Sequence, residues 1–161
     1  MIEADGAEGG ATSARAYFSA QQREAPVEVT AQASIVNQND YPKYEIAQGI
    51  VFCPVKGSNL SLNFVTFPPN SGFPSHVHPE EQISIVREGE MEITIGEESR
   101  IVRPGDVIIF PPHVPHAGRT FDHMCRLIDI FSPPRQGMDE LIARANPVRS
   151  PEVDSWWQEN Q

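Results

Sequence analysis

The chain has 161 residues, long enough for one domain with a substantial core and short for two. Its formal net charge is −10 and no cluster of Lys or Arg stands out, which argues against binding to nucleic acid or to an anionic membrane. Small molecules are the expected partners. With 15 Pro and 11 Gly, the composition indicates many turns and favours an all-β chain.

The sequence shows no targeting or membrane signal. No stretch reaches the roughly 18 uninterrupted apolar residues of a membrane span, and residues 1–30 lack the apolar core of a signal peptide. We therefore expect a cytoplasmic protein. Cys53 and Cys125 lie in apolar stretches without CxxC spacing, which predicts buried, reduced thiols rather than a disulfide or a zinc site.

The chain divides into an arm and a domain. Residues 1–33 are low in aromatic and branched side chains, which predicts a flexible N-terminal arm with a short helix around 13–24. In the domain, expected at 34–135, short β-rich runs alternate with turn signals. The expected strands are 49–55, 59–67, 80–86, 90–96, 99–105, 106–110 and 124–131. Their spacing predicts an antiparallel sandwich or barrel, because both hide strand edges.

Residues 136–161 have a different character from the domain. The segment MDELIARA, 138–145, contains helix-forming residues with apolar side chains on one side, which predicts a helix covering the outside of the barrel. The remaining residues are expected to form an extended tail. Trp156 and Trp157 in this tail would dock on the domain or on a second subunit.

The segment HVHPEEQ, 76–82, suggests a metal site. In an extended strand alternate side chains share a face, so His76, His78, Glu80 and Gln82 project together, whereas Glu81 points the other way. Glu80 follows a proline at an expected bend, which leaves the carbonyl oxygen of Gln82 as the most economical third ligand. A fourth ligand is expected from a distant strand, and the candidates are His113, His116 and His123.

Two sequence motifs resemble those of the cupin superfamily. The first consists of HxH at His76 and His78, three residues, Gln82, six residues and Gly89. The second consists of Gly105, five residues, Pro111, and then His116 at the position of the histidine ligand. The resemblance covers roughly residues 46–132. It implies a double-stranded β-helix, or jelly-roll barrel, with short helical flanks, and a metal held by His76, His78, Gln82 and His116.

This chain departs from the superfamily pattern at two positions. Three residues separate Gly72 from His76 where the pattern has five, and His113 occupies the inner glycine position of the second motif. The segments HPEEQISIVREGEMEITIG and DIFSPPR resemble more closely the KdgF-like cupins of pectin degradation, which act on unsaturated uronates. That resemblance implies functional positions at the pocket mouth for Asp129, Phe131 and Arg135.

The neutral ligand set limits the chemistry. Three imidazoles and an amide leave a divalent ion with its full charge, which favours Lewis acid chemistry on anionic oxygen donors. Gln82 cannot act as a base, unlike the glutamate ligand of quercetin-type dioxygenases. Sulfoniopropionate lyases of similar fold place a tyrosine base where this chain has Ser84. Ligand type does not distinguish among Zn, Ni, Fe, Mn and Co.

Proton transfer then requires a group outside the ligand set. Asp129 is the candidate, because a carboxylate in the apolar run RLIDIF is costly to bury without a partner or a function. The alternative is a structural acid paired with Arg126 or Arg103. Arg135 would clamp a carboxylate or lie on the surface. Phe131 would line the pocket or fill the core.

These observations predict a single-domain, metal-dependent cupin enzyme of the isomerase, lyase or cyclase type, acting as a homodimer. The expected reaction is non-oxidative ring opening, isomerisation or cyclisation of a small oxygenated molecule such as an unsaturated uronate, a keto acid or a polyketide-like compound. An iron-dependent dioxygenase and a non-catalytic binding protein are the alternatives, since one fold supports all three.

Overall fold

The computed structural model describes residues 33–148, of which residues 36–148 belong to the second of the two units into which the chain divides. The description below concerns the second unit. The expected helix around 13–24 and the docking of Trp156 and Trp157 lie outside the described residues. In the part of the chain that is described, no helix is long and apolar enough to cross a membrane.

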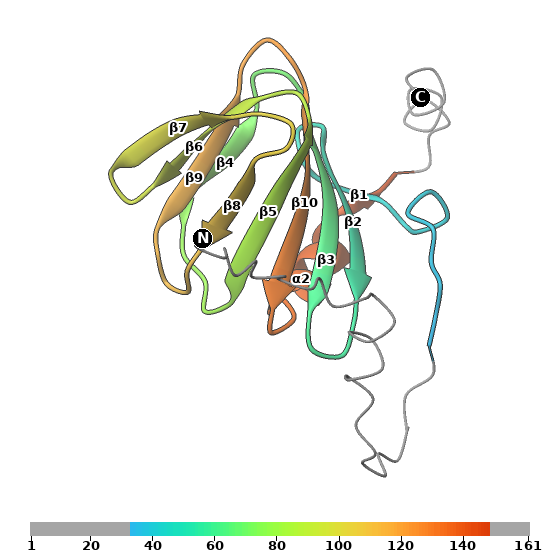
Figure 1. Cartoon of the computed structure of the whole chain (residues 1–161). Helices are drawn as coiled ribbons and strands as arrows, with labels where there is room; N and C mark the ends of the chain where they lie inside the picture. Colours follow the sequence, from blue (N-terminus) through green and yellow to red (C-terminus); the bar gives the residue numbers. More distant parts are fainter. Residues whose placement is uncertain (1–32, 149–161) are drawn as a thin grey trace, which may run out of the picture. The chain divides into compact units, whose positions relative to one another are not determined.

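Two antiparallel sheets make up the unit, as Figure 1 shows. The larger has seven strands in the order β11-β1-β2-β3-β10-β5-β8, and the smaller has four in the order β4-β9-β6-β7. Their bounds are β1 Tyr44–Ala47, β2 Ile50–Lys56, β3 Ser61–Phe67, β4 Gly72–His76, β5 Glu81–Glu88, β6 Met91–Ile95, β7 Glu98–Val102, β8 Val107–Phe110, β9 His116–Thr120, β10 Cys125–Ser132 and β11 Asn146–Pro147. The predicted all-β fold is confirmed.

Strand alternation divides the interior into an apolar part and a polar part. On β3, the side chains of Asn63, Val65 and Phe67 are buried and their neighbours are only partly so. The apolar members join one core with Leu127 of β10 and Met91 of β6, which links the two sheets. Each such side chain contributes roughly 1.5–3 kcal/mol by burial. The polar residues of the interior lie farther along the same face, and Asn63 is the one that β3 contributes.

The predicted strands are present, and the structure adds strands that the sequence did not indicate. β4 and β9 follow segments rich in Pro and Gly or His, and no strand was expected there; the short β1 and β11 pair with each other. Cys53 and Cys125 are free and buried, as predicted. Burial and the nearby Asp129 raise the pKa of Cys125 to about 12, so this thiol is inert.

The HVHPEEQ segment is not one strand. β4 ends at His76 in the smaller sheet and β5 begins at Glu81 in the larger one, with the Pro79 loop between them. Side-chain alternation along one strand therefore does not explain why His76 and His78 lie on the same side as Gln82. The alternation argument holds from Glu81 onward, where Gln82 and Ser84 are buried and Glu81 is exposed.

Candidate metal centre

Three histidines from two sheet segments converge in the interior. His76 ends β4, and its register partner across the smaller sheet is His116, the first residue of β9. His78 lies in the loop after β4. One ring nitrogen of each residue lies within 4.8 Å of the corresponding atoms of the other two, and His78 and His116 are buried. The fold therefore brings together the three predicted histidine ligands.

Each of the three imidazoles is oriented by a backbone carbonyl. The Nδ1 atoms of His76, His78 and His116 lie 3.0, 2.9 and 2.8 Å from the carbonyl oxygens of Pro74, Glu80 and Val114. Because a carbonyl oxygen only accepts, the proton of each neutral ring resides on Nδ1. The lone pair of each Nε2 is thus available. This is the tautomer that supporting hydrogen bonds select in metal-binding histidines.

Gln82 presents its carbonyl oxygen to the same point. Its Nε2 donates to Ser84 Oγ at 2.9 Å, so its Oε1 faces away from Ser84 and lies 3.1 Å from His78 Nε2. With Nδ1 of His78 protonated, this contact joins two acceptors and is unfavourable in a neutral ring. A cation held by these residues would remove the conflict, because both atoms would then donate a lone pair to it.

The electrostatics of the histidines favour the neutral, metal-binding form. Burial, with smaller contributions from His76, His78 and Arg135, lowers the pKa of His116 to about 4. Burial and the charge of Arg135 also lower the pKa of His78. The Nε2 of His116 is buried without a hydrogen-bond partner among residues 33–148. These residues fit a divalent transition metal.

Asp129 is linked to the centre through Ser84. Ser84 Oγ donates to Asp129 Oδ1 at 2.5 Å and accepts from Gln82, so hydrogen bonds connect the carboxylate to the amide. Burial raises the pKa of Asp129 to about 6, although hydrogen bonds from Ser84 and Gln82 oppose the shift. The two arginines of the structural alternative form ion pairs with other carboxylates, Arg126 with Glu88 and Arg103 with Glu90.

Arg135 has a buried partner within the protein. Its guanidinium donates to Glu80 Oε2 at 2.9 Å, and the backbone N–H of Gln136 donates to Glu80 Oε1 at 2.7 Å. Burial of Glu80 opposes ionisation, but these hydrogen bonds together hold its pKa below the usual value. Glu80 is fully buried and serves to fix Arg135, while its own carbonyl orients His78.

The polar groups open into a mostly apolar pocket. Phe131 lies in this pocket, with its ring edge to face against His78 at 5.7 Å and beneath the Arg135 guanidinium at 5.8 Å. Met138 and Leu141 of helix α2, Met138–Arg144, also line it, so this helix lies at the pocket and does not only cover the outside as we predicted. The full lining is Ile46, Ala47, Ile50, Phe52, Asn63, Phe67, Gly72, Phe73, Pro74, His76, Gln82, Asp129, Phe131, Arg135, Met138 and Leu141.

The other candidate histidines lie apart from the cluster. His123 is exposed beside Asp122. His113 has φ 62° at the position where the motif usually has glycine, and its N–H donates to the carbonyl of His78 at 2.8 Å. His113 thus supports the His78 loop through its backbone N–H while its own backbone is in the left-handed conformation.

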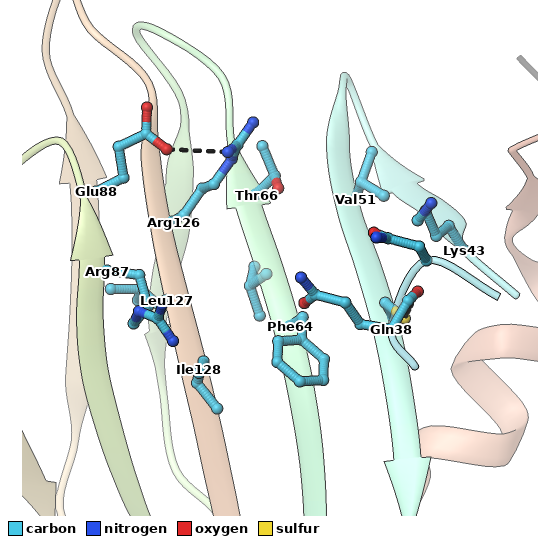
Figure 2. Close-up of a pocket in the computed structure, with 13 residues that line it drawn as sticks. Gln38, Lys43, Val51, Phe64, Thr66, Arg87, Glu88, Arg126, Leu127 and Ile128 are labelled. Atoms are coloured by element: carbon cyan, nitrogen blue, oxygen red, sulfur yellow. Dashed lines mark hydrogen bonds and ion pairs between the residues drawn. The ribbon is translucent and has the colours of Figure 1, made fainter. Parts of the chain in front are cut away.

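A second hollow lies on the other face of the larger sheet, between β2, β3, β10 and the segment around Gln38. Figure 2 shows that its side chains include Lys43, Phe64 and the Arg126–Glu88 ion pair at 2.9 Å. Across the described residues, the histidine cluster is the one group with metal-ligand geometry, and it does not reach this hollow. The candidate metal centre therefore belongs to the interior pocket.

Asn63 is a pocket residue that the sequence pattern did not lead us to expect. It is 1% exposed and interrupts the apolar character of the buried set Asn63, Val65 and Phe67 of β3. The signal was present: Asn63 is a polar residue at an inward position of an alternating strand, and the same argument identified Asp129. Glu80, which we set aside as a ligand, proves to be the anchor of Arg135.

Comparison with known proteins gives consistent results. Residues 63–131 match the family model described as a cupin domain. The chain is 36% identical over 70 residues (43% of this chain, 35% of the relative) to the dimethylsulfoniopropionate lyase DddQ of Ruegeria pomeroyi. It is 38% identical over 70 residues (42% and 29%) to an H2HPP isomerase of Bacillus subtilis. It therefore spans about a third of the length of these curated relatives.

Among solved structures, KdgF from Halomonas sp. superposes with a TM-score of 0.63 at 27% identity, covering 66% of this chain and 99% of that one.

Proposed function

Because this chain belongs to the cupin superfamily and resembles KdgF, we propose that it is a metal-dependent enzyme that performs non-oxidative chemistry on a small oxygenated molecule. The relatives named lyase and isomerase support an enzymatic role of this kind. The proposed reaction is ring opening, isomerisation or cyclisation. Candidate substrates are an unsaturated uronate, a keto acid and a polyketide-like compound.

The observation that carries the proposal is the orientation of the three imidazoles. With each Nδ1 bonded to a carbonyl, His76, His78 and His116 direct their Nε2 lone pairs to one region, and Gln82 adds its amide oxygen. These residues would hold a divalent ion, which would supply Lewis acid chemistry able to polarise a carbonyl or hydroxyl oxygen of a substrate. Four neutral ligands leave the charge of that ion undiminished.

Asp129 is the proposed proton carrier. It lies in the pocket and is connected to Gln82 through Ser84, so its carboxylate is fixed close to the bound molecule. A carboxylate with a raised pKa is suited to remove a proton from one substrate atom and return it to another. Such a transfer needs no oxidant. Arg135 is proposed to orient an anionic substrate group while Glu80 holds the guanidinium in place.

Metal content is the first experiment. Elemental analysis of the untagged protein is expected to find near-stoichiometric divalent metal in the wild type, and loss of it in His116→Ala. Gln82→Ala should retain less than the wild type. His123→Ala is the matched control, because His123 is exposed and outside the cluster. A wild-type protein that takes up no added Zn, Ni, Fe, Mn or Co would reject the proposal.

Oxygen consumption separates the alternatives. Non-oxidative chemistry proceeds under anaerobic conditions and depends on Asp129, so Asp129→Asn should abolish turnover while metal is retained. Turnover that stops without oxygen and requires iron would instead establish a dioxygenase. Ligand binding without turnover, unaffected by Asp129→Asn, would establish a non-catalytic binding protein.

A further inference from the structure

A buried carboxamide in the pocket has no part in the proposed metal binding or proton transfer. Asn63 of β3 lies directly opposite Asp129 of β10, and side chains at such positions share one face of a sheet. Both residues line the interior pocket. Asn63 is 1% exposed, and within residues 33–148 neither its Oδ1 nor its Nδ2 has a hydrogen-bond partner.

An unpaired carboxamide is unfavourable in the interior. Nearly all buried polar groups in folded proteins are hydrogen-bonded, since losing water without gaining a partner costs free energy. A leucine of similar size would fill the same position of β3 without this cost. The unpaired amide of Asn63 therefore indicates that a bound molecule supplies its partner, through an oxygen that accepts from Nδ2 or a hydroxyl that donates to Oδ1.

The rest of the pocket restricts what that molecule is. Its polar groups are few, and a large part of its lining is an apolar wall, which we define as Ile46, Phe52, Phe73, Met138 and Leu141. A sugar acid carries hydroxyl groups around most of its ring, and those that face the apolar wall would lose their hydrogen bonds to water. An alkyl or aryl group gains from the same contact.

We propose that the pocket selects an amphipathic substrate, whose apolar body packs on the apolar wall and whose oxygenated head is bound by the Asn63 amide beside Asp129. This inference rests on the proposed function and names its substrate class: a keto acid or polyketide-like compound with an alkyl or aryl body, rather than a uronate. Asn63 is the residue that selects for the oxygen of the head.

Binding to the metal-free protein tests the inference without any contribution from a metal ligand. The probes are 4-methyl-2-oxopentanoate and 4-methylpentanoate, which share an apolar body and a carboxylate and differ in the 2-oxo oxygen, and D-galacturonate as the hydroxylated comparator. Dissociation constants are measured by NMR titration of the labelled full chain. The wild type should prefer the oxo acid over 4-methylpentanoate by about tenfold, and D-galacturonate should bind most weakly.

In Asn63→Leu, this preference should fall below about twofold while 4-methylpentanoate binds as before. Asn59→Leu, the same substitution at an exposed position before β3, is the control and should retain the preference. If Asn63→Leu does not fold, Asn63→Ala replaces it. A wild-type preference that survives the Asn63 substitution, or tightest binding of D-galacturonate, would overturn the inference.

Failure of this inference is distinct from failure of the proposed function. If the protein takes up no metal but prefers the oxo acid in a manner that depends on Asn63, the enzyme proposal is rejected and the amphipathic ligand class is retained. If the protein binds metal but shows no such preference, the enzyme proposal is retained and the amphipathic ligand class is rejected.

Discussion

Ser84 Oγ lies 2.5 Å from Asp129 Oδ1, and this contact joins β5 to β10 inside the barrel. Because Ser84 also accepts from Gln82, one hydroxyl both fixes the amide carbonyl toward the histidines and stabilises the carboxylate. The orientation of a candidate metal ligand is thereby coupled to the charge of a candidate proton carrier. A change at Ser84 is therefore expected to affect both groups.

Removing the Ser84 hydroxyl should raise the pKa of Asp129 further. Ser84→Ala deletes a hydrogen bond that opposes the shift caused by burial, so the folded protein should hold the Asp129 proton to a higher pH. The measurement is an NMR titration of the Asp129 carboxyl carbon in metal-free protein. Ser99→Ala is the control, because Ser99 Oγ contacts only the exposed Thr94 hydroxyl among the hydrogen bonds described. An unchanged or lower pKa in Ser84→Ala would contradict the prediction.

Asp129 should make stability depend on pH. Its pKa is raised from 3.8 to about 6 on folding, so the folded state binds this proton more tightly than the unfolded state. The resulting stabilisation is complete only well below the unfolded pKa of 3.8 and is lost as pH rises through 6. Relative to Asp129→Asn, the metal-free wild type should therefore lose about 3 kcal/mol between pH 3 and pH 8.

Urea unfolding of both proteins at several pH values measures this difference. The exposed Asp122→Asn controls for the substitution itself. A difference between wild type and Asp129→Asn that stays constant with pH would show that Asp129 titrates alike in the folded and unfolded chain.

The Glu80 carboxylate should be required for stability. It is fully buried and accepts hydrogen bonds from Arg135 and from the backbone of Gln136, so Glu80→Ala leaves a largely buried guanidinium without its partner. We expect a loss of about 3 kcal/mol in the free energy of unfolding. Glu81→Ala, at the exposed neighbouring position, should change it by less than about 0.5 kcal/mol. Similar losses in the free energy of unfolding for the two variants would show that Glu80 does not stabilise the fold through Arg135.

Gly89, which ends the first motif, should not tolerate alanine. It has φ 71°, and a Cβ at this position would overlap the carbonyl oxygen of Met124 at the start of β10. Gly96 has φ 60° but nothing within 4 Å of the corresponding Cβ position. Gly96→Ala should cost about 1 kcal/mol through backbone strain alone, whereas Gly89→Ala should prevent folding or cost several-fold more. Thermal unfolding of both variants makes the comparison, and equal losses would refute the steric argument.

Local patterns in the sequence were enough to predict the fold class and most of the candidate site. Short alternating runs and frequent Pro and Gly determined the all-β class, because a period of two and tight turns are local properties of the chain. The resemblance of two segments to the cupin motifs implied that the three histidines and Gln82 form one set. Asp129 could be identified as an anomaly, since a carboxylate in an apolar strand needs a reason to be there.

Other features depend on which strands become neighbours. The sequence could not show that β4 and β5 belong to different sheets, nor that Glu80, rather than a substrate alone, engages Arg135. It also did not reveal the partners of Asp129, because Ser84 and Asp129 are separated by 45 residues and meet only through the pairing of β5 with β10.

The sequence by itself thus determined the all-β class and seven of the strands, which follow from local periodicity, while its resemblance to the cupin motifs supplied the candidate ligand set. Only the tertiary structure decided the protonated nitrogen of each histidine, the direction of the Gln82 amide and the presence of Asn63 in the pocket. These depend on hydrogen bonds and burial between segments far apart in the chain, which no local pattern specifies.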